Sequence, residues 1–281
     1  MAMSEEQTRS LIAELQSEWD AVSEVRAFRQ PKSRRGQRFT GADAARITAI
    51  IGLSRHVHDT SPAIMLLLEH GHISAAVPLV RLVFECSLTA AWLVQSTDDH
   101  GIRAFLHSYS RSRSSLQKDA MEATTRVFRD GAPEITDTDP TPFGGSYDDA
   151  HRFGEICLDL KPAGKDAYIY YRVLSGLSHA SPRVADLDFA PDSPDAGIPA
   201  FRPTPNQSFP TDVLAFFTAA SMVWSARAYS YLITNTQYRN FLRRSARQLE
   251  INDELQLSER YWERHAKNEA KRRAEKSVND D

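Results

Sequence analysis

The stretch ISAAVPLVRLVFECSLTAAWLV, residues 73–94, decides the fold class. It is the longest apolar run of the chain, and two charged residues, Arg81 and Glu85, interrupt it. Wound as a helix, it is apolar on every side, which is typical of a helix buried among other helices. Charges near its centre favour a core helix over a membrane span, because a charge inside a bilayer is costly. We therefore predict a central helix over residues 71–95.

Helical periodicity continues on both sides of this stretch. Leu15 and Trp19 belong to an apolar stripe at helical spacing, and Ser4 predicts a capped start to their helix. The other predicted helices span residues 4–29, 42–69, 98–127, 165–179, 211–235 and 238–276, and residues 147–160 are a candidate for a further short helix. We expect a break at Ser61-Pro62, because proline lacks the N–H that a helix interior needs.

Strands have almost no support in the sequence. No segment alternates apolar and polar residues with the β-branched enrichment that strands show. The sequence therefore predicts an all-α protein, a helical bundle of about six or seven helices.

Two unusual segments divide the chain. Residues 26–38 hold six basic residues and no acidic one, which indicates a basic linker or exposed arm. Residues 181–210 hold seven prolines and several aspartates, which predicts a long Pro/Asp-rich loop. We predict an N-terminal helix with a basic linker over 1–38, a helical-bundle core over 39–236 and a charged C-terminal helix over 237–281.

Composition limits the kind of function. A net charge of -3 and a pI near 6.3 argue against a protein that coats nucleic acid or membranes, although they allow a local basic patch. Two cysteines, Cys86 and Cys157, lie far apart, and Cys86 falls in the apolar run, where a buried thiol is expected. The N-terminus carries early acidic residues and no apolar leader. These features predict a cytoplasmic protein.

The charged pair in the central helix is the first candidate site. Arg81 and Glu85 are four residues apart, so they lie on the same helix face. Their apolar surroundings predict that the pair is buried, and buried charges need partners. The pair is either a structural ion pair that fixes helix packing or part of a functional site.

The second candidate site lies in the helix predicted over 165–179. Tyr168, Arg172, Ser175 and His179 are spaced to form one stripe along it. The stripe is either the solvated face of the helix or a functional surface. Gly176 costs about 1 kcal/mol relative to alanine within a helix, so we expect close packing against another helix there.

The two segments together suggest a chemistry. If Glu85 faces His179 or Arg172 across a helix interface, a carboxylate orients a histidine beside a guanidinium. Histidine titrates near neutrality and can take the proton of a ribose 2′-hydroxyl. Arginine can bind the phosphate through two hydrogen bonds and stabilise its developing charge. The array suits RNA cleavage without a metal, with His179 as the base or acid and Arg172 as the phosphate clamp. Glu85, Arg81 and Ser175 take supporting roles.

The spacing of Arg172 and His179 is similar to the signature of the HEPN superfamily, an arginine followed a few residues later by a histidine. This resemblance implies a helical bundle that acts as a ribonuclease in bacterial defence or toxin–antitoxin systems. It also implies a homodimer that brings two such helices together.

Three longer segments resemble a bacterial family catalogued as a domain of unknown function. They are G-H-x-x-A-A-x-x-L-V-R-L-V-F-E at 71–85, Arg103 to Leu106, and Y-x-x-L-S-x-x-x-H-A-S-P-R at 171–183. The likeness spans roughly residues 45–235. It implies an α-helical fold with Arg81, Glu85, Ser175 and His179 as signature positions.

Other functions give a different account of the same residues. The sequence predicts no cofactor and no metal centre, because the histidines of the pairs 56/58 and 70/72 are two apart and so lie on different sides of a helix.

A non-catalytic binding or regulatory bundle is the alternative function, with the Arg/Glu/His residues as a structural cluster. The expected partners are RNA, a second copy of the chain or another protein, and no membrane. Basic residues at 26–38, at 239–247 and at 267–276 are candidates for phosphate contacts.

Overall fold

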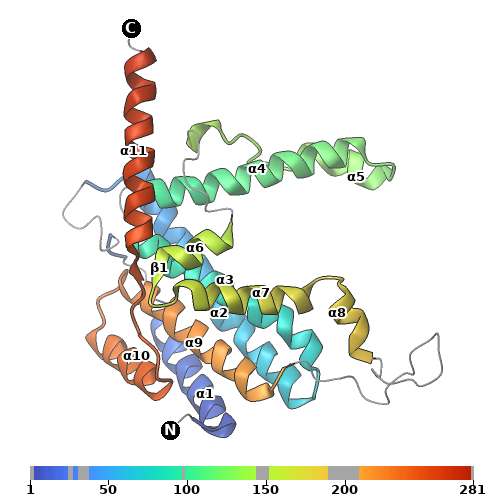
Figure 1. Cartoon of the computed structure of the whole chain (residues 1–281), viewed down its shortest axis with the longest axis vertical. Coiled ribbons are helices and arrows are strands. Elements are labelled where there is room, and N and C mark those ends of the chain that lie inside the picture. Colours follow the sequence, from blue (N-terminus) through green and yellow to red (C-terminus); the bar gives the residue numbers. More distant parts are fainter. Residues whose placement is uncertain are drawn as a thin grey trace.

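The computed structural model describes residues 3–24, 28–30, 38–96, 99–143, 152–188 and 209–279. Within these ranges the chain forms eleven α-helices and two strands of two residues each (Figure 1). The helices are α1 (Glu5–Val22), α2 (Gly41–Glu69), α3 (Ile73–Gln95), α4 (His100–Glu122), α5 (Arg126–Gly131), α6 (Phe153–Asp159), α7 (Gly164–Ser178), α8 (Pro182–Ala185), α9 (Thr211–Ser230), α10 (Thr236–Gln248) and α11 (Glu259–Asn279). The all-α prediction is confirmed, and the count of six or seven helices is wrong.

The extra helices come mainly from a segment predicted as a loop and from two predicted helices that are split. Helix α8 lies in the predicted Pro/Asp-rich loop, and the helix predicted over 98–127 is divided after Glu122 into α4 and α5. The single helix predicted over 238–276 is two helices, because Glu250 takes a left-handed φ of 55°. The connection between them contains β2 (Gln256–Leu257), which pairs antiparallel with β1 (Leu160–Lys161).

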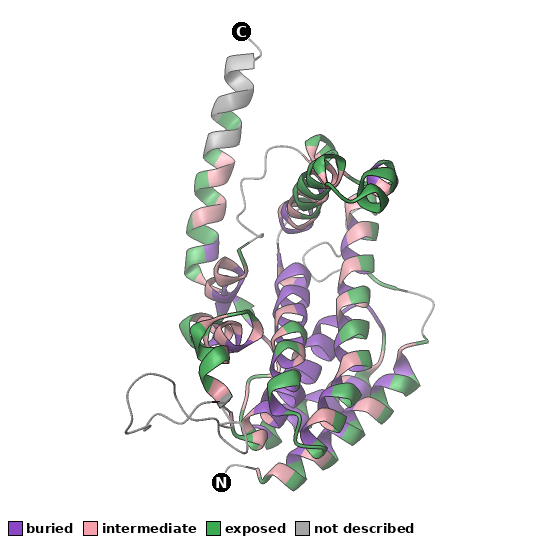
Figure 2. Cartoon of the chain, turned by 90° about the vertical axis from the view of Figure 1, so that its right-hand side faces the viewer, coloured by how far each residue is buried: buried purple, intermediate pink, exposed green. Residues whose placement is uncertain are grey.

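Helices α2, α3 and α9 form the centre of the molecule, with α1 and α7 packed outside them (Figures 1 and 2). Both α3 and α9 are buried over most of their surface, as predicted for the apolar run. In the part of the chain that the structure describes, α3 is the one helix long and apolar enough to cross a membrane, and most of it is buried inside the protein. Cys86 is buried as predicted, and burial together with the charge of Glu85 raises the pKa of its thiol to about 12.

The starts of α1 and α2 show why these helices begin where they do. Ser4 accepts a hydrogen bond from the Gln7 backbone N–H, and the Gln7 side chain accepts one from the Ser4 N–H. This capping box confirms the predicted start of the first helix. Thr40 and Asp43 form the same arrangement at the start of α2.

The predicted break at Ser61-Pro62 is wrong, because α2 runs through Pro62 without interruption. The Ser61 hydroxyl turns back to donate to the Val57 carbonyl at 2.7 Å. Packing of α2 against α3 and α9 stabilises the helix in spite of the backbone donor that proline removes.

Two parts of the chain project from this core (Figures 1 and 2). We call residues 105–131, the outer part of α4 with α5, the α4–α5 arm. Large apolar side chains are exposed along it, among them Leu116 and Phe128. The second projection is α11, which is anchored at its start by the buried Tyr261 and by ion pairs from Arg264 to Asp159 and from Arg260 to Glu155.

Candidate functional site

The structure brings together four side chains that we call the Arg81 cluster: Arg81, Glu85, Tyr171 and His179. Arg81 Nε donates to Glu85 Oε1 at 2.6 Å, and Arg81 Nη1 lies 2.6 Å from His179 Nε2. Arg81 Nη2 donates to the Tyr171 hydroxyl at 3.4 Å, and the guanidinium lies 5.0 Å from the centre of the Tyr171 ring. One guanidinium therefore joins α3 to α7 and to the residue that follows it.

The end of α7 explains how His179 reaches Arg81. Helix α7 ends at Ser178, and His179 has an extended backbone with φ of -127° and ψ of 155°. The prediction that His179 continues the stripe of α7 is therefore wrong, because the residue has left the helix. Tyr171 lies three residues before the buried Leu174, so it points to the side of α7 that packs on α3.

The predicted Arg81–Glu85 ion pair is present, but it is only partly buried, with 17% and 28% of the two side chains exposed. Burial raises the pKa of Glu85 above its ordinary value, and the charge of Arg81 opposes this rise. The predicted proximity of Glu85 to His179 is thus present, with Arg81 between the two groups.

The contact with Arg81 requires one particular tautomer of His179. A guanidinium only donates hydrogen bonds, so His179 Nε2 must be the acceptor and Nδ1 must carry the ring proton. An anion that binds Arg81 competes for the same N–H groups and releases Nε2. The cluster can therefore bind an oxyanion and provide a free imidazole nitrogen in one step.

Two predicted site residues lie beside the cluster without joining it. Arg172 is exposed, and its guanidinium lies 6.0 Å from the centre of the Tyr168 ring. No hydrogen bond or ion pair of the described residues joins Arg172 to the Arg81 cluster. Ser175 donates its hydroxyl to the Tyr171 carbonyl at 2.7 Å, within its own helix. Tyr171 is the member that the sequence reasoning missed, although it is the first residue of the segment 171–183.

Among the residues that the structure describes, none packs closely against Gly176, contrary to the prediction. A Cβ built on Gly176 would meet a single neighbouring atom, Arg183 Cδ, at 4.0 Å. No close contact among the described residues therefore requires a glycine at position 176 of α7.

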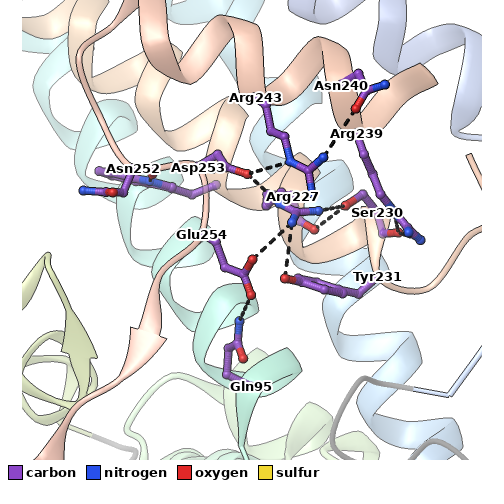
Figure 3. Close-up of polar contacts among 11 residues, drawn as sticks. Gln95, Arg227, Ser230, Tyr231, Arg239, Asn240, Arg243, Asn252, Asp253 and Glu254 are labelled. Atoms are coloured by element: carbon purple, nitrogen blue, oxygen red, sulfur yellow. Dashed lines mark hydrogen bonds and ion pairs between the residues drawn. The ribbon is translucent and has the colours of Figure 1, made fainter. Parts of the chain in front are cut away.

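A second polar network surrounds Arg227 (Figure 3). Arg227 Nε donates to Asp253 at 2.9 Å, Nη2 donates to Glu254 at 3.2 Å, and the guanidinium lies 4.7 Å from the centre of the Tyr231 ring. Arg227 Nη1 also donates to the Ser230 hydroxyl at 3.1 Å. Buried and surrounded by these partners, Arg227 joins α9 to the connection before α11 and has a structural role.

The basic residues at 239–247 are largely engaged by the protein itself. Arg239 donates to the backbone carbonyls of Ser230, the last residue of α9, and of Ile233, three residues further on. Arg244 stacks on Phe241, with 5.4 Å between the guanidinium and the ring centre. Of the predicted basic linker at 26–38, residues 28–30 and 38 are described, and the rest lies outside the described residues. The same holds for residues 189–208 of the predicted long loop.

The histidines occupy three different settings. His56 is exposed while His58 is fully buried on the other side of α2, as their spacing predicts. His58 stacks on Trp19 with 4.2 Å between ring centres, and burial lowers its pKa to about 3. His100 lies beside His265 and Glu269 of α11, which the sequence reasoning missed. The i,i+4 spacing of His265 and Glu269 was the available signal, but the sequence contains no sign of their contact with His100.

Comparison with known proteins gives one match. Residues 48–139 match a family described as a family of unknown function (DUF5677). This segment runs from within α2 to just beyond α5, so it includes Arg81 and Glu85 but neither Tyr171 nor His179. No curated protein and no solved structure matches the chain. The chain is thus similar, over that segment, to a family whose function is unknown.

Proposed function

We propose that the Arg81 cluster binds RNA phosphodiesters and cleaves them without a metal ion. The observation that carries this proposal is the 2.6 Å contact between Arg81 Nη1 and His179 Nε2. It sets a phosphate-binding group beside a proton acceptor, and His179 is exposed to solvent.

The proposed reaction begins when a backbone phosphate takes the N–H groups of Arg81 that face His179. Glu85 keeps the guanidinium in place through Nε, and His179 Nε2 is released. Nε2 then takes the proton of the adjacent 2′-hydroxyl, whose oxygen attacks the phosphorus atom. The bond to the 5′-oxygen breaks, and that oxygen takes a proton from solvent. The products are a 2′,3′-cyclic phosphate end and a 5′-hydroxyl end.

In this proposal Arg81 takes the phosphate-binding role that the sequence assigned to Arg172. Arg172 is exposed on α7, one residue after Tyr171, and it supplies positive charge for a neighbouring phosphate. Ser175 keeps a supporting role, because its hydroxyl oxygen can still accept a hydrogen bond while its proton is held by the Tyr171 carbonyl. An RNA substrate also agrees with the cytoplasmic location proposed from the sequence.

The test is cleavage of a mixed RNA pool by the purified chain with EDTA present. We expect cyclic-phosphate ends from RNA and no cleavage of DNA, because DNA lacks the 2′-hydroxyl. His179→Ala should lower the rate by about 100-fold or more. Arg81→Lys should also lower it strongly, because lysine cannot make the paired hydrogen bonds of a guanidinium. His56→Ala, which removes an exposed histidine from α2, is the matched control and should cleave normally.

The α4–α5 arm favours a second function, a non-catalytic binding or regulatory bundle. Its exposed apolar side chains, including Tyr109, Leu116, Met121, Val127 and Phe128, are typical of a protein contact surface. The partner would be a second copy of the chain or another protein. In that case the Arg81 cluster is a structural network between α3 and α7. Absence of cleavage by the wild type, with a lower melting temperature for His179→Ala, would favour this function.

A further inference from the structure

We infer that His100, His265 and Glu269 form a binding site for one divalent transition-metal ion of the Zn²⁺ class. Each residue offers one ligand atom, and the three atoms lie within 4.8 Å of one another. The site lies where the first residue of α4 meets α11 (Figure 1). It is separate from the Arg81 cluster and goes beyond the metal-independent function proposed for that cluster.

The two helices position the ligands in different ways. His265 and Glu269 are four residues apart on α11, so their side chains lie on the same face of that helix. His100 begins α4, and its Nε2 lies 3.0 Å from Glu269 Oε1. The imidazole rings of His100 and His265 face each other with 4.9 Å between their centres and a tilt of 35°.

These distances are close to those of a bound ion. Ligands that surround Zn²⁺ tetrahedrally at about 2.0–2.1 Å stand about 3.3 Å from one another. The 3.0 Å separation of His100 Nε2 and Glu269 Oε1 is close to this value, and all three ligand atoms lie within 4.8 Å of one another. Without an ion, the same pair forms a hydrogen bond or ion pair.

The surroundings hold the ligands while leaving access for an ion. The side chains of His100 and Glu269 are 11% and 24% exposed, so the site is partly shielded and still open to solvent. Tyr261, which is buried in the core, stacks near His265 with 5.8 Å between ring centres and restricts its orientation. Asp99 precedes His100, and its buried Oδ1 has no hydrogen-bond partner among the described residues.

The donor set selects the class of ion. Two imidazole nitrogens and one carboxylate oxygen suit Zn²⁺ and similar transition metals, with a fourth position left for water. Ca²⁺ and Mg²⁺ prefer six or more oxygen ligands, which these three residues do not offer.

The ion would connect two projecting parts of the molecule. Described contacts hold α11 at its root, through Arg264 and Arg260 to α6 and the residues beside it. Beyond that root, the metal site would fix α11 to the start of α4. Zn²⁺ should therefore raise the melting temperature and protect α11 from proteolysis, because an ion that binds the folded state stabilises it.

The direct test is titration of the full chain after chelator treatment and dialysis. We expect calorimetry to show one Zn²⁺ bound per chain with a dissociation constant below about 10 µM. Co²⁺ should replace it and give the visible absorption of a tetrahedral site. Absence of saturable Zn²⁺ binding, or a Co²⁺ spectrum like that of the hydrated ion, would overturn the inference.

The variants test whether these residues are the ligands. Glu269→Gln keeps the size of the side chain and should weaken Zn²⁺ binding at least tenfold. His265→Ala should weaken it further, while His72→Ala removes an exposed histidine elsewhere and should bind as the wild type does. Circular dichroism of the metal-free variants checks that they fold. Unchanged affinity in a folded Glu269→Gln variant would assign the binding to other residues and overturn the site. RNA cleavage in EDTA is measured independently, so the two proposals can fail separately.

Discussion

Helices α3 and α4 are both 23 residues long, but their surroundings differ completely. Most of α3 is buried between α2, α7 and α9, whereas α4 buries four residues and extends away from the core (Figure 2). The sequence of α3 is apolar on all sides, so neighbouring helices must cover it. The sequence of α4 has polar residues at most positions, so it can form a helix without being enclosed.

The difference shows where chemically useful groups can lie. Inside the core, the buried guanidinium of Arg227 is engaged by the carboxylates of Asp253 and Glu254. At the edges of the core, where two helices meet near the surface, charged groups are partly shielded and still reachable. Both proposed sites lie at such edges: Arg81 faces the end of α7, and His100 faces α11.

The largest expected difference between the two helices comes from the same substitution in each. Leu88 in α3 is fully buried, while Leu116 in α4 is 51% exposed. Leu88→Ala should lower the free energy of unfolding by about 2–5 kcal/mol, because it removes buried methyl groups and leaves a cavity. Leu116→Ala should change it by less than about 0.5 kcal/mol. Urea denaturation measures both. A large loss for Leu116→Ala would mean that the α4–α5 arm is covered in solution.

The next largest expected change in unfolding free energy comes from the protonation of His58 at low pH. Burial lowers the pKa of His58 to about 3, below its unfolded value of 6.5, so the neutral ring stabilises the folded state above pH 6.5. That contribution is lost as the pH falls from 6.5 towards 3. Between pH 7 and pH 4 we expect the wild type to lose about 3 kcal/mol more unfolding free energy than His58→Phe.

The control for this titration is His56→Phe, which changes an exposed histidine on the same helix. It should keep the pH dependence of the wild type. Equal slopes for the wild type and His58→Phe would show that His58 becomes protonated without unfolding the core.

Ion pairs give a third comparison between the core and the arm. Arg227 is buried with Asp253 and Glu254, whereas Arg126 and Asp130 form an exposed pair on α5. Arg227→Met should cost about 2 kcal/mol of unfolding free energy, because it leaves two partly buried carboxylates without their partner. Arg126→Met should cost less than about 0.5 kcal/mol. Thermal unfolding in low and high salt measures the loss of stability in each variant. Equal losses for the two variants would contradict the expected difference between the buried and the exposed ion pair.

The sequence predicts the core well, because periodicity and burial are linked there. The central helix, the capped start at Ser4 and the burial of Cys86 all follow from local patterns. The error at Ser61-Pro62 has a physical cause: tertiary packing on both sides stabilised a helix that the local rule predicted to break. The helix predicted over 238–276 is split after Gln248 because Glu250 adopts a left-handed backbone conformation. Glutamate does not predict that conformation, so the sequence does not predict the split.

The sites could be predicted only in part, because they depend on contacts between distant segments. The Arg81–Glu85 pair follows from its i,i+4 spacing, and it is present. The position of His179 depends on α7 ending one residue earlier than helical spacing assumes, which turns the side chain towards Arg81. The approach of His100 to α11 joins residues more than a hundred positions apart, and no local pattern contains that information.

The smallest expected change in unfolding free energy comes from a glycine-to-alanine comparison. The two positions are Gly176 in α7 and Gly101 at the start of α4. A Cβ at Gly101 would lie 2.6 Å from Ser96 Oγ and 2.8 Å from Ser96 Cβ, so Gly101→Ala should destabilise the protein. A Cβ at Gly176 meets only Arg183 Cδ at 4.0 Å, so Gly176→Ala should raise the unfolding free energy by about 0.5 kcal/mol. Thermal denaturation measures whether each substitution raises or lowers the stability. A loss of stability in Gly176→Ala would restore the close packing predicted from the sequence, and it would mean that another surface covers α7 in solution beside His179.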